Sequence, residues 1–94
     1  MSSLSGPELV RNVARRIAEC RVQLGWTQQE LAERMGVSIQ YEQRVESGQA
    51  NLTLSSLARW SAMLRVHPRA LLDAPTSPPP PRGRPPGRPS RRSR

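Results

Sequence analysis

The sequence predicts an all-α domain of five short helices followed by a tail rich in Pro and Arg. Apolar residues recur at steps of three and four up to about residue 72, the period of helices that bury one face, and no stretch alternates strictly as a half-buried strand does. From Ala74 onward the composition changes, because eight of the last 21 residues are Pro. Such a segment cannot bury enough surface to offset its ordering entropy. We therefore expect a folded domain over residues 1–73 and a disordered tail over residues 74–94.

The first helix is predicted to begin at Ser5. The pattern Ser5-x-x-Glu8 forms a capping box, in which each side chain bonds the backbone N–H of the other residue, and Pro7 fits the first turn. Six residues at helical spacing then share one face: Val10, Val13, Ala14, Ile17, Arg21 and Leu24. Cys20 lies along the same side, so we expect it to be a buried filler.

Two shorter helices follow, separated by a tight turn. Thr27-x-x-Glu30 is a second capping box and opens a helix that ends at Gly36. Its inward residues are Leu31, Ala32 and Met35. Ser38 caps a third helix, which is expected to end at Gly48, a residue type suited to a left-handed C-terminal position.

The last two helices complete the predicted domain. Thr53 or Ser55 starts the fourth helix. One of its faces gathers Leu54, Leu57, Ala58, Ser61 and Leu64. Pro68 fits the first turn of a short fifth helix that runs to residue 72 or 73, with His67 at its start.

Residues 27–48 place two short helices around a tight turn, which is the arrangement of the helix-turn-helix. The chain reads Arg21-x-x-x-Gly25-Trp26-Thr27-Gln28-Gln29-Glu30-Leu31-Ala32-Glu33-Arg34-Met35-Gly36-Val37-Ser38, then Val45-Glu46-Ser47-Gly48, then Asn51-Leu52-Thr53-Leu54-x-x-Leu57. Over about residues 10–73 it resembles the lambda-repressor-like (XRE) DNA-binding family. The stretch from Asn51 to Leu54 is also similar to the controller proteins of restriction–modification systems. The resemblance implies a sequence-specific, DNA-binding transcriptional regulator of bacterial type.

The third helix is the predicted recognition helix, the one that enters the major groove. With Val37 and Val45 facing the core, the helical period turns four residues outward: Gln40, Gln43, Arg44 and Ser47. From this face and the resemblance, the expected base contacts are Ile39, Gln40, Gln43 and Arg44. Gln suits the edge of adenine, Arg the edge of guanine and Ile the thymine methyl group. The expected phosphate contacts are Gln28, Ser38, Tyr41 and Asn51, with Gln28 at a helix N-terminus where free N–H groups favour an anion.

Two further residues match a structural feature of the family, and one departs from it. The resemblance implies a buried ion pair between Arg21 and Glu46 that joins the first helix to the end of the third. Glu42 stands where the family places an aliphatic residue, on the inward side three residues before Val45. We expect this carboxylate to reach the rim, to find a partner such as an Arg, or to distort the helix. The ring of Tyr41 would then fill part of the space that the Glu42 side chain leaves.

The tail holds most of the charge of the chain. Nine arginines and all seven acidic residues leave residues 1–73 at +2, whereas six arginines and no acid leave residues 74–94 at +6. Residues 81–85 resemble the core of an AT-hook, and a weaker copy follows at residues 87–89. The candidate contacts are Arg82, Gly83, Arg84, Pro85, Arg88, Arg91 and Arg92. They predict binding in the minor groove of A·T tracts, with nonspecific attraction to phosphates and recognition of the prolines by a partner protein as alternatives.

Composition excludes several classes of protein. One Cys and one His allow neither an internal disulfide nor a four-ligand zinc site, and no apolar run approaches the length of a membrane helix. No Ser/His/Asp or paired-carboxylate set is identifiable, so we expect no enzyme, no cofactor and no small-molecule ligand. We expect a cytoplasmic, nucleoid-associated protein, with double-stranded DNA as its partner.

A single domain of this kind offers few base contacts, so we expect a homodimer on a two-fold symmetric operator. Apolar residues near Trp60, Met63 and the fifth helix are candidates for the dimer surface. The first alternative function is a narrower regulatory role, as a restriction–modification controller, a phage repressor or an antitoxin. The second is an adaptor that binds other proteins through its Pro-rich tail.

Overall fold

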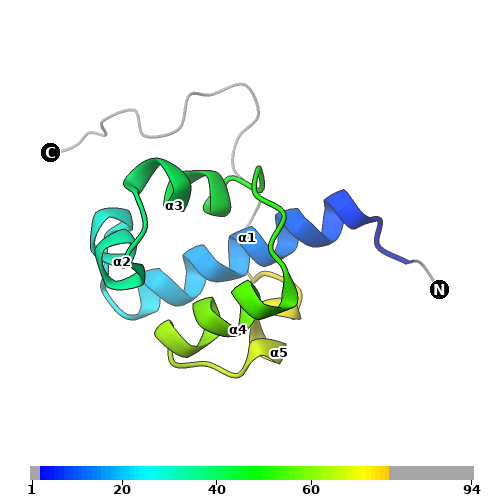
Figure 1. Cartoon of the computed structure of the whole chain (residues 1–94). Helices are drawn as coiled ribbons and strands as arrows, with labels where there is room; N and C mark the ends of the chain where they lie inside the picture. Colours follow the sequence, from blue (N-terminus) through cyan, green and yellow to red (C-terminus); the bar gives the residue numbers. More distant parts are fainter. Residues whose placement is uncertain (1–2, 77–94) are drawn as a thin grey trace, which may run out of the picture.

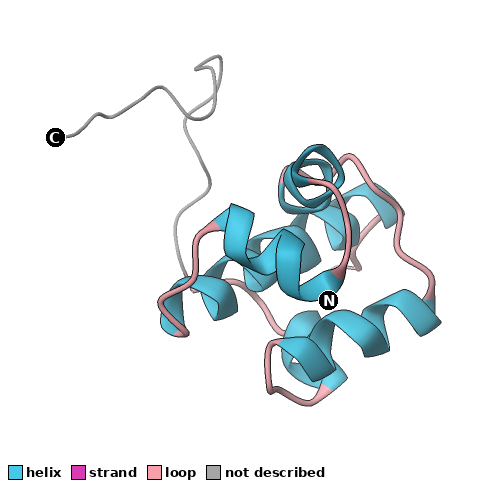
Figure 2. Ribbon diagram, turned by 60° about the vertical axis from the view of Figure 1, so that its left-hand side comes forward, coloured by secondary structure: helices cyan, strands magenta, loops and turns pink. Residues whose placement is uncertain are grey.

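The computed structural model describes residues 3–76, and this part of the chain is entirely helix and loop (Figures 1 and 2). Its helices are α1 (Gly6–Gln23), α2 (Gln28–Met35), α3 (Ile39–Glu46), α4 (Leu54–Met63) and α5 (Pro68–Leu72). The prediction of an all-α fold with five helices is confirmed. The AT-hook-like core at 81–85 and nearly all of the predicted tail lie outside the described residues.

The helix starts follow the predicted caps. Ser5 and Thr27 each form a complete capping box, with their backbone N–H groups bonded to Glu8 Oε1 at 2.8 Å and to Glu30 Oε1 at 2.7 Å. Ser38 caps α3, and Thr53 rather than Ser55 caps α4. His67 caps α5, with Pro68 in the first turn. Each of these contacts spans two or three residues, which explains why the sequence alone reveals them.

Gly48 has the left-handed conformation predicted for it, although the last helical residue lies two positions earlier. The helix stops at Glu46, Ser47 closes it, and Gly48 follows in the left-handed region at φ +80°. The Gly48 N–H donates to the Val45 carbonyl, so this glycine caps the last turn of the helix although it is not itself helical. A Cβ at this position would lie 3.1 Å from Cγ of Arg11 on α1, so a larger residue would also have to displace that side chain.

The core lies between α1, α2 and α4, with Val45 of α3 and Leu71 of α5 closing its sides. Its fully buried members include Ile17, Leu31 and Leu64, and Cys20 is buried as expected. Burial raises the pKa of the Cys20 thiol.

The buried face of α4 differs from the prediction. It consists of Leu57, Trp60, Ser61 and Leu64. Leu54 is 83% exposed, because it is the first residue of the helix and stands at a rim rather than beneath a neighbouring helix. Ala58 is exposed because it is turned away from the row that begins at Leu57. Trp60, near which the sequence places candidates for the dimer surface, is itself a core residue at 2% exposure.

Side chains on α1 hold α5 in place. Arg16 Nε donates to the Ala70 carbonyl at 2.8 Å, and Arg16 Nη1 pairs with Glu19 Oε1 at 2.7 Å. Glu19 Oε2 accepts the backbone N–H of Thr76 at 2.8 Å. Contacts with α1 therefore continue three residues beyond Asp73. None of the helices in residues 3–76 combines the length and apolar content needed to cross a membrane.

Candidate nucleic-acid interface

Helices α2 and α3 form a compact pair joined by Gly36, Val37 and Ser38. Gly36 takes the left-handed conformation at φ +73°, and the Val37 N–H bonds the Ala32 carbonyl at 3.0 Å, which turns the chain sharply after α2. Ser38 Oγ then accepts the N–H of Tyr41 at 3.0 Å and starts α3. Figure 1 shows α3 along the upper edge of the domain, with one side of the helix facing away from α1 and α2.

The outer side of α3 presents a polar row. Gln40, Gln43, Arg44 and Ser47 are exposed, as the helical period predicts. Ile39, the first residue of the helix, is half-buried. On the opposite side, Val45 is buried in the core at 2% exposure and fixes the rotation of the helix. The row therefore stands on a rigid element, with amide and guanidinium groups facing solvent.

The four candidate phosphate contacts occupy different environments. Gln28 is the first residue of α2 and half-buried, and its Oε1 faces Gln43 Nε2 at 3.4 Å. Ser38 is exposed at the start of α3, whereas Tyr41 is half-buried against the core. Asn51 is exposed in the loop between α3 and α4. The structure thus brings Gln28 and Gln43 together across the motif.

An ion pair between Arg21 and Glu46 connects α1 to the end of α3. Arg21 Nε lies 2.7 Å from Glu46 Oε2, Nη2 lies 3.1 Å from Oε1, and the two side chains are 14% and 5% exposed. The remaining arm, Arg21 Nη1, donates to the Trp26 carbonyl at 2.7 Å. Gln28 Nε2 also donates to Glu46 Oε1, at 3.1 Å. One carboxylate therefore fixes α1, α2 and α3 relative to one another.

The pKa of Glu46 reflects this set of contacts. Burial by itself raises the pKa of the carboxyl, but hydrogen bonds with Glu42, Arg21 and Gln28 outweigh it and hold the pKa below its ordinary value. The sequence did not indicate that Gln28, a candidate phosphate contact, also anchors on Glu46. The Gln28–Glu46 distance in sequence is 18 residues, so no local pattern could have revealed it.

Glu42 does not reach the rim and does not pair with an arginine; it lies buried beside Glu46. It is 0% exposed, and neither of its carboxyl oxygens accepts a hydrogen bond from another group within residues 3–76. The helix is not distorted, since the Glu42 N–H bonds the Ser38 carbonyl at 3.0 Å. Burial, followed by the hydrogen bond and charge of the nearby Glu46, raises the pKa of Glu42 to about 9. A pKa in this range favours the protonated carboxyl at pH 7, the form that can stand beside the Glu46 carboxylate without repulsion.

Comparison with known proteins identifies this arrangement. A model of the HTH_3 helix-turn-helix family matches residues 17–71. The chain belongs to the HTH_3 family. This confirms the resemblance to the XRE type that the sequence carries between Arg21 and Leu57. No curated protein sequence matches this HTH_3 chain significantly.

Solved structures of regulators resemble this HTH_3 domain. A hypothetical transcription factor NHTF from Neisseria is 31% identical, covers 80% of this chain and 86% of its own, and superposes with a TM-score of 0.68. The restriction-modification controller protein C.AhdI from Aeromonas hydrophila is 31% identical, with 66% and 94% covered and a TM-score of 0.61. SinR, a master regulator for biofilm formation solved in complex with DNA, is 35% identical, with 65% and 98% covered and a TM-score of 0.58. The HTH_3 protein is accordingly a DNA-binding transcription regulator.

Proposed function

We propose that this regulator binds a specific operator by placing α3 in the major groove and reading base edges with Ile39, Gln40, Gln43 and Arg44. The exposed row on α3 is the observation that carries the proposal, because it offers amide and guanidinium groups from a helix locked on its other side by Val45 and Glu46. Gln matches the N6/N7 edge of adenine and Arg the O6/N7 edge of guanine. The protein acts by binding, and no catalytic step is part of the proposal.

Contacts to the DNA backbone set the position of α3 in this proposal. Gln28 stands at the N-terminus of α2, where free N–H groups and the helix dipole favour a phosphate. One hydrogen of its Nε2 is used by Glu46, which leaves the second hydrogen for the ligand. Ser38, Tyr41 and Asn51 are assigned to flanking phosphates. These contacts supply register rather than sequence information.

Arg44→Ala is expected to weaken operator binding by about 1–3 kcal/mol while leaving binding to unrelated DNA nearly unchanged. The loss follows from removing one bidentate contact to guanine. The operator would first be selected from a random DNA pool with the full chain, and affinities then measured by fluorescence anisotropy. Gln28→Ala should instead weaken binding to all sequences, since it removes a backbone contact. Arg69→Ala, an exposed arginine on α5, is the control. An equal loss on operator and unrelated DNA for Arg44→Ala would contradict base reading.

We also propose that the six arginines of the tail bind the same DNA, in the A·T minor groove or on phosphates. The AT-hook-like core at residues 81–85 supports the minor groove, since planar guanidinium groups suit that narrow, electronegative space. Pro residues on both sides favour an extended chain that can follow the groove.

Removing residues 77–94 should flatten the slope of log K against log salt by about five units if every tail arginine neutralises a phosphate. The truncation keeps the Thr76 contact with Glu19 and removes all six arginines. A chain of full length with the six arginines replaced by Ser separates the effect of charge from that of length. An unchanged salt slope would show that the tail does not bind the DNA. If the truncation weakens binding equally at sites flanked by A·T and by G·C, the tail does not bind the minor groove of A·T tracts.

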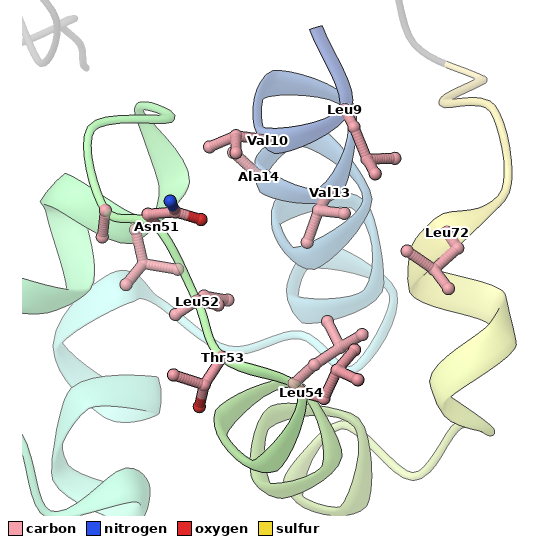
Figure 3. A pocket seen from close by; sticks show the side chains of 12 residues that line it. Leu9, Val10, Val13, Ala14, Asn51, Leu52, Thr53, Leu54 and Leu72 are labelled. Atoms are coloured by element: carbon pink, nitrogen blue, oxygen red, sulfur yellow. The ribbon is translucent and has the colours of Figure 1, made fainter. Parts of the chain in front are cut away.

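A homodimer is the assembly that we propose, with an apolar hollow beside α1 as its interface. Leu9, Leu54 and Leu72 are exposed around this hollow, and Val13 and Leu52 line its inner part (Figure 3). An exposed Leu beside an apolar recess suits a two-fold contact in which each copy inserts into the other. It includes Leu72 of the fifth helix, as the sequence led us to expect, and leaves out Trp60, which is buried.

Leu54→Glu is expected to weaken self-association at least tenfold and to reduce cooperative binding to a two-fold operator, because it places a charge in an apolar contact. Analytical ultracentrifugation with and without operator DNA measures both states. Leu4→Glu, a substitution of another exposed leucine outside the hollow, is the control. A wild-type chain that is monomeric both free and on DNA would contradict the homodimer.

The second candidate function is control of a restriction–modification system. The stretch from Asn51 to Leu54 and the similarity to C.AhdI support it. The selected operator provides the test. Its occurrence beside genes for a DNA methyltransferase and an endonuclease supports this role, and operators only at unrelated genes contradict it.

A further inference from the structure

A basic hollow lies between the end of α2 and the C-terminal half of α4, away from the polar row on α3. Its floor contains Trp26 and Met63, both half-buried. Arg34, Arg59 and Arg65 line it and are exposed. No carboxylate lines this hollow, which we call the Trp26 surface. Neither the core nor the DNA-binding motif explains why three guanidinium groups gather there.

The three arginines are held by groups other than acids. The Arg34 guanidinium lies 4.1 Å from the centroid of the Trp26 ring, and that of Arg65 lies 5.7 Å from it, both within range for cation–π attraction. Arg59 Nη2 donates to the Met35 carbonyl at 3.1 Å. Within residues 3–76, none of the three forms an ion pair with a carboxylate. The surface thus keeps its positive charge.

Arg65 adds an independent observation. It is the one non-glycine residue among residues 3–76 with a positive φ, at +65°. It follows the end of α4, where the Val66 N–H bonds the Ser61 carbonyl at 3.0 Å, and this position ordinarily takes glycine. A side chain in the left-handed region costs free energy that glycine avoids. Strain of this kind concentrates at functional sites, and here it places a guanidinium group over the hollow.

We propose that the Trp26 surface docks an acidic segment of a partner protein, with an apolar side chain of that segment on Trp26 and Met63. Charge complementarity selects this occupant. The tail of the chain carries +6 and would be repelled, and a second copy in a two-fold contact would bring like charges together. Figure 1 shows the end of α4 along the lower edge of the domain and α3 along the upper edge, so a duplex on α3 lies on the other side.

The test uses the full chain and a fluorescein-labelled synthetic peptide in which Asp and Glu surround one Leu. A second peptide replaces the acids with Asn and Gln. We expect saturable binding of the acidic peptide at physiological salt, weakened about tenfold or more by Arg34→Gln, Arg59→Gln and Arg65→Gln together. The matched control removes the same number of charges from the tail, as Arg82→Gln, Arg84→Gln and Arg88→Gln, and should leave the affinity within about twofold.

Arg65→Gly separates docking from stability. Because glycine adopts the left-handed conformation without strain, the Tm should rise. The loss of the guanidinium group should at the same time weaken binding of the acidic peptide. Operator binding should stay unchanged in every variant of this surface, and peptide and operator should bind together. The proposal is overturned if the peptide does not bind, if the uncharged peptide binds equally, or if the tail variant loses as much affinity as the surface variant. Displacement of the peptide by operator DNA would also overturn it, because the surface would then be a DNA contact.

Discussion

Glu42→Leu is expected to stabilise the domain by about 2–3 kcal/mol at pH 7, which would raise the Tm by roughly 10–15 °C. The wild-type carboxyl is fully buried, and its two oxygens accept no hydrogen bond from another group among the described residues. Folding at pH 7 therefore requires the uptake of a proton that the unfolded chain does not carry. Leucine has a similar volume and suits a fully buried position on the same side of α3 as Val45. Thermal unfolding followed by circular dichroism measures the change.

The pH dependence identifies the cause. Glu42 titrates near 4.5 in the unfolded chain and at about 9 in the folded one, so the folded state binds one more proton between these values. Stability from this group should therefore fall as the pH rises through that window, by up to about 1.4 kcal/mol per pH unit. The stability of Glu42→Leu should not show this decline. The difference in stability between Glu42→Leu and the wild type should therefore grow from pH 5 to pH 8. Glu42→Gln, which is neutral and close in shape, should also lose it. Parallel curves for wild type and both variants, or a lower Tm for Glu42→Leu, would contradict the assignment.

Arg21→Met is expected to destabilise the domain by about 3–5 kcal/mol. Its guanidinium supplies both hydrogen bonds of the pair with Glu46 and a third to the Trp26 carbonyl. Without it, Glu46 remains buried, and its remaining hydrogen bonds are those with Gln28 and Glu42. A loss of this size is a large fraction of the stability of a small domain, so denaturant unfolding at low temperature is the suitable measurement.

The double variant shows whether the uncompensated charge is the cause. Arg21→Met with Glu46→Leu should be more stable than Arg21→Met alone, because no unpaired carboxylate is left in the interior. The loss in the single variant should also shrink at acid pH, where Glu46 takes up a proton. Arg69→Met controls for the removal of an exposed arginine and should change stability by less than about 0.5 kcal/mol. If the double variant is no more stable than Arg21→Met, the loss of stability comes from lost packing and not from an unpaired carboxylate.

Agreement between sequence and structure depends on how far apart the interacting residues are. Ser5 with Glu8 and Thr27 with Glu30 interact within one helical turn, so the sequence predicts them directly. The inward position of Glu42 also follows from its distance to Val45 along one helix. The pair of Arg21 and Glu46 spans 25 residues and could be anticipated only from the family pattern.

The errors have the same origin. Helical spacing places Leu54 and Leu57 on one side of a helix, but it does not show where the neighbouring helices end. It therefore cannot predict that Leu54 is 83% exposed and Leu57 only 6%. The spacing of Trp60 suits both a core and an interface, and only the packing of the helices shows that its ring is buried. The gathering of Arg34, Arg59 and Arg65 around Trp26 depends on the packing of α2 against α4, and no local pattern indicates it.

The sequence by itself determined the helical fold class, the caps, the turn of the helix-turn-helix and the outward row on α3, because each depends on residues within a few positions of one another. Only the tertiary structure decided that Glu46 holds both Arg21 and Gln28, that Glu42 is fully buried with a raised pKa, and that a basic surface forms around Trp26. The physical reason is that desolvation and partner choice depend on the groups that distant segments bring within a few ångströms.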